Sequence, residues 1–257
     1  GFQRPINKDD ASAPNLYDLT RQAGYTIVGS YDEAKQHIHA SKLLLVPASD
    51  FANPNKGAGA LPYAIDRQEG DLSLAKIVDI AVQHLSKHDR FFMMAEGGKI
   101  DYSGHGNDAA TNIHEVMDMD QAIQVAYQFY LQHPDETLIV VTADHETGGM
   151  NLGKEDSFEL QLLQYQKCSS DQFSSRLSAL REQMGAKLSW EQVKTFLAEN
   201  TGLYMQIEMS DDEDEALQQA YKQMMRKQAT VKTLYEDINV LLAGPCAHRG
   251  LHRLWYT

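Results

Sequence analysis

Five side chains that bind metal ions well lie in two short motifs. The first motif, AEGGKIDYSGH, holds Glu96, Asp101 and His105, and the second, TADH, holds Asp144 and His145. Three carboxylates and two neutral imidazoles form a mixed set of hard and borderline ligands. Such a set suits Zn²⁺ where nitrogen is present and Mg²⁺ where only oxygen is available. One ion does not need so many ligands, so the set predicts more than one metal ion.

Either motif alone is a weak signal. An Asp and a His four residues apart, such as Asp101 and His105, occur often by chance. Asp144 followed by His145 could equally be a helix cap with a hydrogen-bonded neighbour. Glu96 in a glycine-rich turn is unremarkable by itself. The metal site is favoured because both motifs follow apolar runs that are predicted to be neighbouring strands.

The elements that must position these residues follow from the apolar pattern. Short apolar runs predict buried strands at residues 43–48, 90–95 and 137–143. Apolar residues at helical spacing predict helices at residues 72–85 and about 113–130, between the strands. A strand, a helix and a second buried strand form a βαβ unit with parallel strands. Both motifs then lie at the carboxyl ends of the strands, where sites form in open α/β sheets.

The second half of the chain has a different texture. Residues 154–243 contain two glycines and no proline, and their apolar spacing predicts amphipathic helices. The predicted helices span residues 158–167, 171–183, 189–199, 211–228 and 231–242. Ser189 followed by Gln192 resembles a capping box. The acidic run at residues 211–215 could bind a metal, but we favour a solvated helix start, where the helix dipole stabilises acidic side chains.

These patterns together predict an α/β fold. Residues 1–153 form a partial core, with a mainly parallel sheet sandwiched by helices. Residues 154–243 form a helical insertion, and residues 244–257 form an irregular tail.

Composition excludes several classes of protein. The chain has 257 residues and a formal net charge of −13, so it lacks the basic footprint of a nucleic-acid-binding protein. No apolar run approaches the roughly 20 residues of a membrane-spanning helix. The first ten residues, GFQRPINKDD, lack the apolar stretch of a signal peptide. The two cysteines, Cys168 and Cys246, are too few for a disulfide framework.

The motifs and their order resemble the alkaline phosphatase family. EGGKID is followed by His105, by a helix that contains HEVMDMDQAI, and then by TLIVVTADH. Upstream, LLLVPASDF and LPYAIDR stand in the order that this family shows before its Glu-Gly-Gly segment. The resemblance covers roughly residues 15–150. It implies an alkaline phosphatase-like fold and a phosphate monoester as substrate.

The resemblance also implies a role for each ligand. By resemblance, Glu96 is a ligand of one Mg²⁺, Asp101 and His105 bind one Zn²⁺, and Asp144 and His145 bind a second. In the family, a serine attacks the phosphate and forms a phosphoserine intermediate. One zinc activates the serine, and the other stabilises the leaving group.

Other parts of the family pattern are expected outside this sequence. No catalytic residue is identified here, because the nucleophilic serine is expected upstream of Gly1. The third zinc histidine has no clear match, since His248 and His252 lack the expected surroundings. One hypothesis is that residues 244–257 are read in a shifted frame. By resemblance, the intact enzyme is periplasmic or extracellular and a homodimer.

Two alternatives stay open at this point. Other members of the superfamily, such as a phosphodiesterase, a sulfatase or a phosphomutase, share paired Asp/His metal ligands. A chain without its nucleophile could also be a catalytically incompetent metal-binding fragment. Glu96 in its EGGKID setting favours the three-metal phosphatase.

Overall fold

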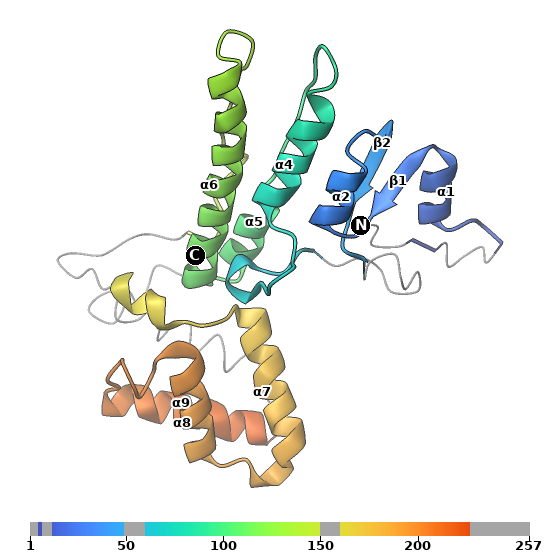
Figure 1. The fold of residues 1–257 in the computed structure, drawn as a ribbon. Helices are drawn as coiled ribbons and strands as arrows, with labels where there is room; N and C mark the ends of the chain where they lie inside the picture. The colour runs from blue at the N-terminus through green and yellow to red at the C-terminus, as the bar shows by residue number, and fades with distance from the viewer. Residues whose placement is uncertain (1–4, 7–11, 49–59, 150–159, 227–257) are drawn as a thin grey trace. The chain divides into compact units, whose positions relative to one another are not determined.

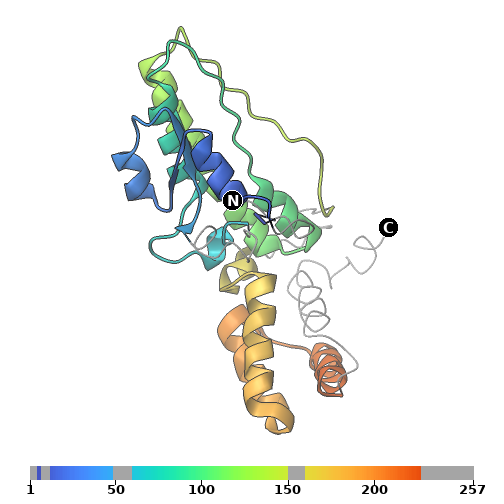
Figure 2. The same cartoon turned by 90° about the vertical axis from the view of Figure 1, so that its right-hand side faces the viewer.

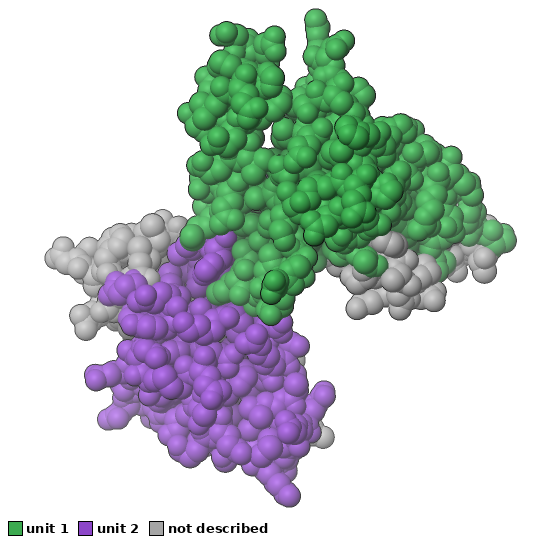
Figure 3. All heavy atoms as spheres, in the orientation of Figure 1, with its two compact units in different colours: residues 1–97, 115–142 green, residues 98–114, 143–257 purple. Residues whose placement is uncertain are grey.

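The computed structural model describes residues 5–6, 12–48, 60–149 and 160–226 (Figure 1 and Figure 2). These residues belong to two compact units, which are described separately (Figure 3). Unit 1 holds residues 1–97 and 115–142, and unit 2 holds residues 98–114 and 143–257. The helices and strands follow one another as α1 Leu16–Gln22, β1 Tyr25–Val28, α2 Tyr31–Gln36, β2 Lys42–Leu45, η1 Ala64–Asp66, α4 Leu74–Leu85, α5 Gly98–His105, α6 Ala109–Gln132, η2 Leu160–Tyr165, α7 Ser170–Met184, η3 Gly185–Lys187, α8 Trp190–Thr201 and α9 Asp211–Met225.

The sheet of unit 1 is a small parallel pair. Strand β1 pairs with β2 in a register that places Tyr25 opposite Lys42 and Val28 opposite Leu45. The connection between them is α2, so the three elements form a βαβ unit. Strand β2 confirms part of the strand predicted at residues 43–48. Strand β1 was not predicted, because YTIV is a short run that helical and strand periodicity cannot separate.

The two long helices α4 and α6 confirm the helices predicted at residues 72–85 and about 113–130. Helix α4 begins after Ser73, whose hydroxyl accepts a hydrogen bond from the backbone N–H of Lys76. Val78 and Val82 of α4 are buried in one cluster with Ala122 of α6. Burial of this apolar stripe holds the helices in place.

Two of the predicted strands are wrong in the described parts of the chain. Residues 90–95 and 137–143 run extended but pair with no strand there, where the sheet contains β1 and β2 alone (Figure 2). Phe92 and Leu138 are each 87% exposed. An apolar run becomes a strand only when a neighbour accepts its backbone hydrogen bonds. The α/β prediction therefore holds only in part, because the described chain is mostly helical with a small parallel sheet.

The helices of unit 2 surround a core of their own. Phe173, Leu177, Leu197 and Leu217 are each at most 1% exposed and belong to one cluster built from α7, α8 and α9. These helices confirm three of the helices predicted for the second half of the chain. The segment predicted as a helix at residues 158–167 contains the 3₁₀ helix η2 instead.

The helix starts of unit 2 follow capping rules. Ser189 and Gln192 form the predicted capping box at the start of α8. A second capping box, which sequence reasoning missed, joins Ser210 and Glu213 at the start of α9. The acidic run at residues 211–215 therefore begins a helix, as the helix-dipole interpretation predicts.

Some sequence predictions fall outside the described residues. These are the helix at residues 231–242 and the irregular tail at residues 244–257. Among the helices that the structure describes, none combines the length and the apolar character needed to cross a membrane.

Candidate metal centre

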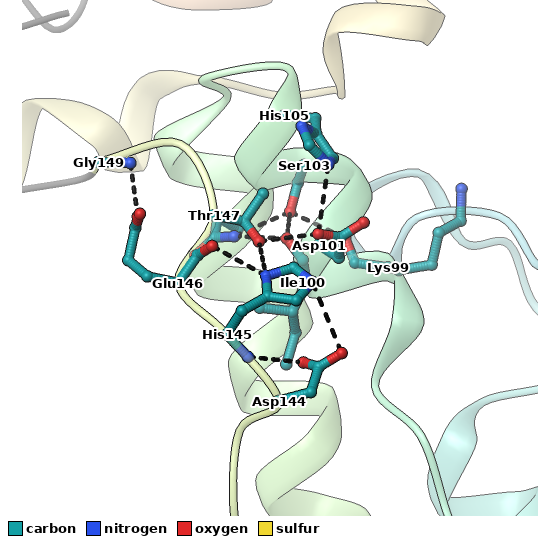
Figure 4. Close-up of polar contacts among 11 residues, drawn as sticks. Lys99, Ile100, Asp101, Ser103, His105, Asp144, His145, Glu146, Thr147 and Gly149 are labelled. Atoms are coloured by element: carbon teal, nitrogen blue, oxygen red, sulfur yellow. Dashed lines mark hydrogen bonds and ion pairs between the residues drawn. The ribbon is translucent and has the colours of Figure 1, made fainter. Parts of the chain in front are cut away.

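Asp101 and His105 lie on helix α5 in unit 2 (Figure 4). The sequence suggested a glycine-rich turn here, but the segment is helical, and a spacing of four residues places both side chains on one face. His105 Nε2 lies 3.4 Å from Asp101 Oδ1. The first turn of α6 supports this helix, because Asn112 Nδ2 donates to Ile100 O at 2.8 Å and to Ser103 Oγ at 3.0 Å.

Asp144 and His145 lie in the loop that follows the extended segment at residues 137–142. The backbone N–H of His145 donates to Asp144 Oδ1 at 3.1 Å, and His145 Nε2 lies 3.6 Å from Asp144 Oδ2. His145 Nδ1 lies 2.9 Å from Glu146 O. This hydrogen bond, and then the charge of Asp144, raise the pKa of His145 above its usual value. With its proton on Nδ1, the neutral ring presents the Nε2 lone pair toward Asp144.

Thr147 joins the two motifs. Its hydroxyl donates to Asp101 Oδ1 at 2.8 Å, and the same oxygen lies 3.0 Å from His145 Nδ1 (Figure 4). A single hydroxyl thus contacts a predicted ligand of each zinc. Sequence reasoning missed Thr147. It lies 46 residues from Asp101 in the chain, and nothing in the sequence indicates that the two side chains meet.

Two glycines let the loop approach α5 closely. Gly148 has a φ of +87°, and a Cβ atom there would collide with the backbone oxygen of Gly104. A Cβ atom on Gly104 would lie 2.9 Å from Thr147 O. Asn107 adds to this contact, because its amide nitrogen can donate to Gly104 O at 3.3 Å and to Gly148 O at 3.1 Å. The close approach is what allows Thr147 to reach Asp101.

We expect Gly148→Ala to separate the loop from α5. The new methyl group overlaps the backbone of Gly104, so the variant should lose about 1–3 kcal/mol of unfolding free energy more than Gly149→Ala. Gly149 is a matched control, since its φ of +66° carries a similar backbone penalty, but its Cβ would meet no atom of the described residues within 4 Å. Urea unfolding of both variants measures the difference. Equal costs for the two variants would contradict the close contact.

The spacing within each Asp/His pair suits zinc. Ligand atoms at about 2.0–2.2 Å from a tetrahedral zinc lie roughly 3.3–3.5 Å from one another. The observed separations, 3.4 Å in the α5 pair and 3.6 Å in the loop pair, fit or closely approach this range. Carboxylate oxygen and imidazole nitrogen are also donors that zinc accepts. Each pair could therefore hold two of the four positions around one ion.

Neither pair is a complete site by itself. Within the described ranges, no three side chains of His, Cys, Asp or Glu are grouped so that they could hold a metal ion. A four-coordinate zinc at either pair needs further ligands. Glu96 is an exposed residue of unit 1, at the end of the extended segment before α5. Its predicted place in a magnesium site stays a prediction.

The chain is similar to alkaline phosphatases in sequence. The model of the alkaline phosphatase family matches residues 4–249. Alkaline phosphatase 3 of Bacillus subtilis (strain 168) is 35% identical over 145 residues, which are 56% of this chain and 29% of that protein. The repressible alkaline phosphatase of Saccharomyces cerevisiae is 40% identical over 147 residues, or 53% of this chain and 25% of that protein. The chain thus spans less than a third of the length of these relatives.

Solved structures agree with the sequence comparison. The cold-active alkaline phosphatase of the psychrophile Shewanella sp. shares the fold with a TM-score of 0.69 at 22% identity, over 96% of this chain and 53% of that one. The Thermus thermophilus alkaline phosphatase gives a TM-score of 0.62 at 26% identity, over 89% of this chain and 44% of that one. The family model covers nearly the whole sequence, and the fold agrees with it. The chain belongs to the alkaline phosphatase family.

Proposed function

We propose that this chain is part of a metal-dependent phosphate monoester hydrolase of the alkaline phosphatase type. Asp101 and His105 hold one zinc ion, Asp144 and His145 hold a second, and Glu96 is a ligand of magnesium. The observation that carries the proposal is the hydroxyl of Thr147, which contacts both Asp101 and His145 in a chain that belongs to this family.

The chain's own residues have distinct tasks in this proposal. The carbonyl of Glu146 fixes the proton of His145 on Nδ1 and leaves Nε2 free to bind. Thr147 orients the carboxylate of Asp101 by donating to Oδ1, the oxygen that lies 3.4 Å from His105 Nε2. When bound, zinc supplies Lewis-acid stabilisation of the charge on a phosphate and its leaving group. The net charge of −13 does not attract an anionic substrate, so the attraction must be local.

We further propose that the serine nucleophile lies in a segment that these 257 residues do not contain. The short coverage of the relatives supports this, since the chain spans 29% and 25% of the two proteins compared. In the intact enzyme that serine forms the phosphoserine intermediate. Family resemblance also underlies our proposal that the intact enzyme is an exported homodimer.

Hydrolysis assays with zinc and magnesium test the proposal. A version extended upstream to include the serine segment should hydrolyse p-nitrophenyl phosphate, and Asp144→Ala should abolish this activity. The 257-residue chain should show no turnover above the metal-only blank. Comparable turnover by the 257-residue chain, abolished by Asp144→Ala, would contradict our placement of the nucleophile.

Two further substrates separate the alternatives. Preference of the extended version for bis-p-nitrophenyl phosphate would favour a phosphodiesterase, and preference for p-nitrophenyl sulfate would favour a sulfatase. Stoichiometric zinc binding with no hydrolysis of any of the three esters would favour a catalytically incompetent metal-binding protein.

A further inference from the structure

We propose that Asp108 is a positioning residue that couples the metal-ligand helix α5 to the helices α7–α9. Asp108 is 1% exposed and lies between α5 and α6 in unit 2. It is not one of the predicted metal ligands. Its importance comes from the number of segments that meet at one carboxylate.

The backbone of Asp108 is attached to α5. Its N–H donates to Ser103 O at 3.0 Å, and its carbonyl accepts from the N–H of Asn112 at 2.8 Å. Asn112 in turn donates through Nδ2 to Ile100 O and to Ser103 Oγ. The end of α5 and the first turn of α6 therefore move as one piece with Asp108.

The side chain of Asp108 binds two other segments of the same unit. Oδ1 accepts from the backbone N–H of Thr111 at 3.2 Å, which caps α6, and from Gln166 Nε2 at 2.7 Å. Oδ2 accepts from the backbone N–H of Ser170 at 2.7 Å, at the first residue of α7. One carboxylate thus lies at the N-termini of two helices.

The network continues into α8. Gln166 Nε2 also donates to Cys168 O at 2.9 Å, and the N–H of Lys167 donates to Asn200 O at 2.9 Å. Arg176 of α7 donates to Asn200 Oδ1 at 3.0 Å. Asp108 therefore connects a polar network of the helical segment to the piece that carries Asp101 and His105.

The charge of Asp108 is met by N–H groups. Within the described residues, the carboxylate forms no ion pair with Lys, Arg or His. Its stabilisation comes from two helix dipoles and from hydrogen bonds to the ionised group, which are stronger than neutral ones. Water cannot replace a lost partner at 1% exposure. A shorter side chain would leave the Ser170 N–H unpaired and release α5 from the helical segment.

Asp108→Ser separates the coupling between α5 and the helical segment from the capping of α6. Serine is itself a good N-cap, so it can still cap α6, but it is too short to reach both Gln166 and Ser170. Ser210→Ala is the control, because it removes a cap of α9 in the same unit without contacting α5. Asp108→Asn is the second variant if Asp108→Ser does not fold, as judged by circular dichroism.

Two measurements on the 257-residue chain test the coupling. Hydrogen exchange over residues 98–107, without metal, should be about tenfold faster in Asp108→Ser and within twofold of wild type in Ser210→Ala. The second measurement, which rests on the proposed function, is competition with a chromophoric chelator. It should show zinc affinity about tenfold weaker in Asp108→Ser only.

The two measurements fail separately. Exchange over residues 98–107 that matches the Ser210→Ala control would overturn the positioning role of Asp108. Faster exchange with unchanged zinc affinity would overturn the link between Asp108 and the metal ligands. If the wild-type chain binds no zinc, the affinity measurement is made on the version extended upstream, and absence of zinc binding there overturns the proposed function. In that case the exchange result alone decides whether Asp108 holds α5.

Discussion

Asp101→Asn should weaken zinc binding by the 257-residue chain more than about 100-fold. The substitution replaces a charged ligand oxygen with a neutral amide and removes half of the α5 pair, whose donor atoms lie 3.4 Å apart. It also disturbs the acceptor of the Thr147 hydroxyl. Loss of an outer partner of a ligand costs about 10–100-fold in metal affinity, and loss of the ligand itself should cost more. Competition with a chromophoric chelator measures the change.

Asp212→Asn is the matched control for that experiment. Asp212 is exposed in the first turn of α9, in the same unit, and its substitution removes the same charge. We expect its zinc affinity to stay within twofold of wild type, since a surface charge contributes little to binding elsewhere. If both variants bind zinc equally well, α5 does not carry the zinc site.

Phe173→Ala should lower the unfolding free energy of the helical segment by about 3–5 kcal/mol. Phe173 is 1% exposed, and its ring meets that of Phe196 edge-on with centroids 5.0 Å apart. Removing it leaves a cavity in the core formed by α7, α8 and α9. Urea unfolding followed by the fluorescence of Trp190, which packs against this core, reports the loss.

Phe92→Ala makes the same chemical change at an exposed site. Phe92 is 87% exposed, so its substitution should change the unfolding free energy by no more than about 0.5 kcal/mol. A cost for Phe173→Ala as small as that for Phe92→Ala would show that α7–α9 do not form the packed core described above.

The helices of this chain could be predicted because their signals are local. In α4, Leu74 and Val78 recur at the period of the helix and belong to one apolar cluster. Ser189 and Gln192 lie three residues apart and form the capping box that this spacing indicates. Such patterns involve residues that are close together in the chain, so they can be recognised without knowing the rest of the fold.

The strands could not be predicted in the same way, because a strand needs a partner. LLLVPA and RFFMMA are both short apolar runs, yet only the first lies beside a strand, β1, with which it pairs. In the second run, Met93 and Ala95 pack against α4 and α6, while Phe92 and Met94 are exposed. Apolar character on both faces predicts burial, but it does not identify what covers the outer face.

The sequence predicted the candidate ligands of the site, but it did not predict the contacts that join the two ligand segments. The sequence motifs indicated that the Asp101 and Asp144 segments would meet, and the structure brings them together in unit 2. The contact itself depends on Thr147 and on the missing side chains of Gly104 and Gly148. The sequence does not reveal these residues, because a contact between segments that are far apart in the chain produces no repeating residue pattern.

The unpaired extended segments have a practical consequence for work in solution. Residues 91–95 and 138–141 offer apolar side chains, with Met94 at 82% and Val140 at 73% exposure, beside backbone groups that pair with no strand in the described structure. Exposed backbone of this kind is a template for pairing between copies, and apolar neighbours strengthen the association. We therefore expect the chain to aggregate in concentrated samples. Replacing the exposed Phe92 and Met94 with Lys should reduce this association. Zinc titrations should therefore use dilute samples of such a variant, so that they report on single molecules.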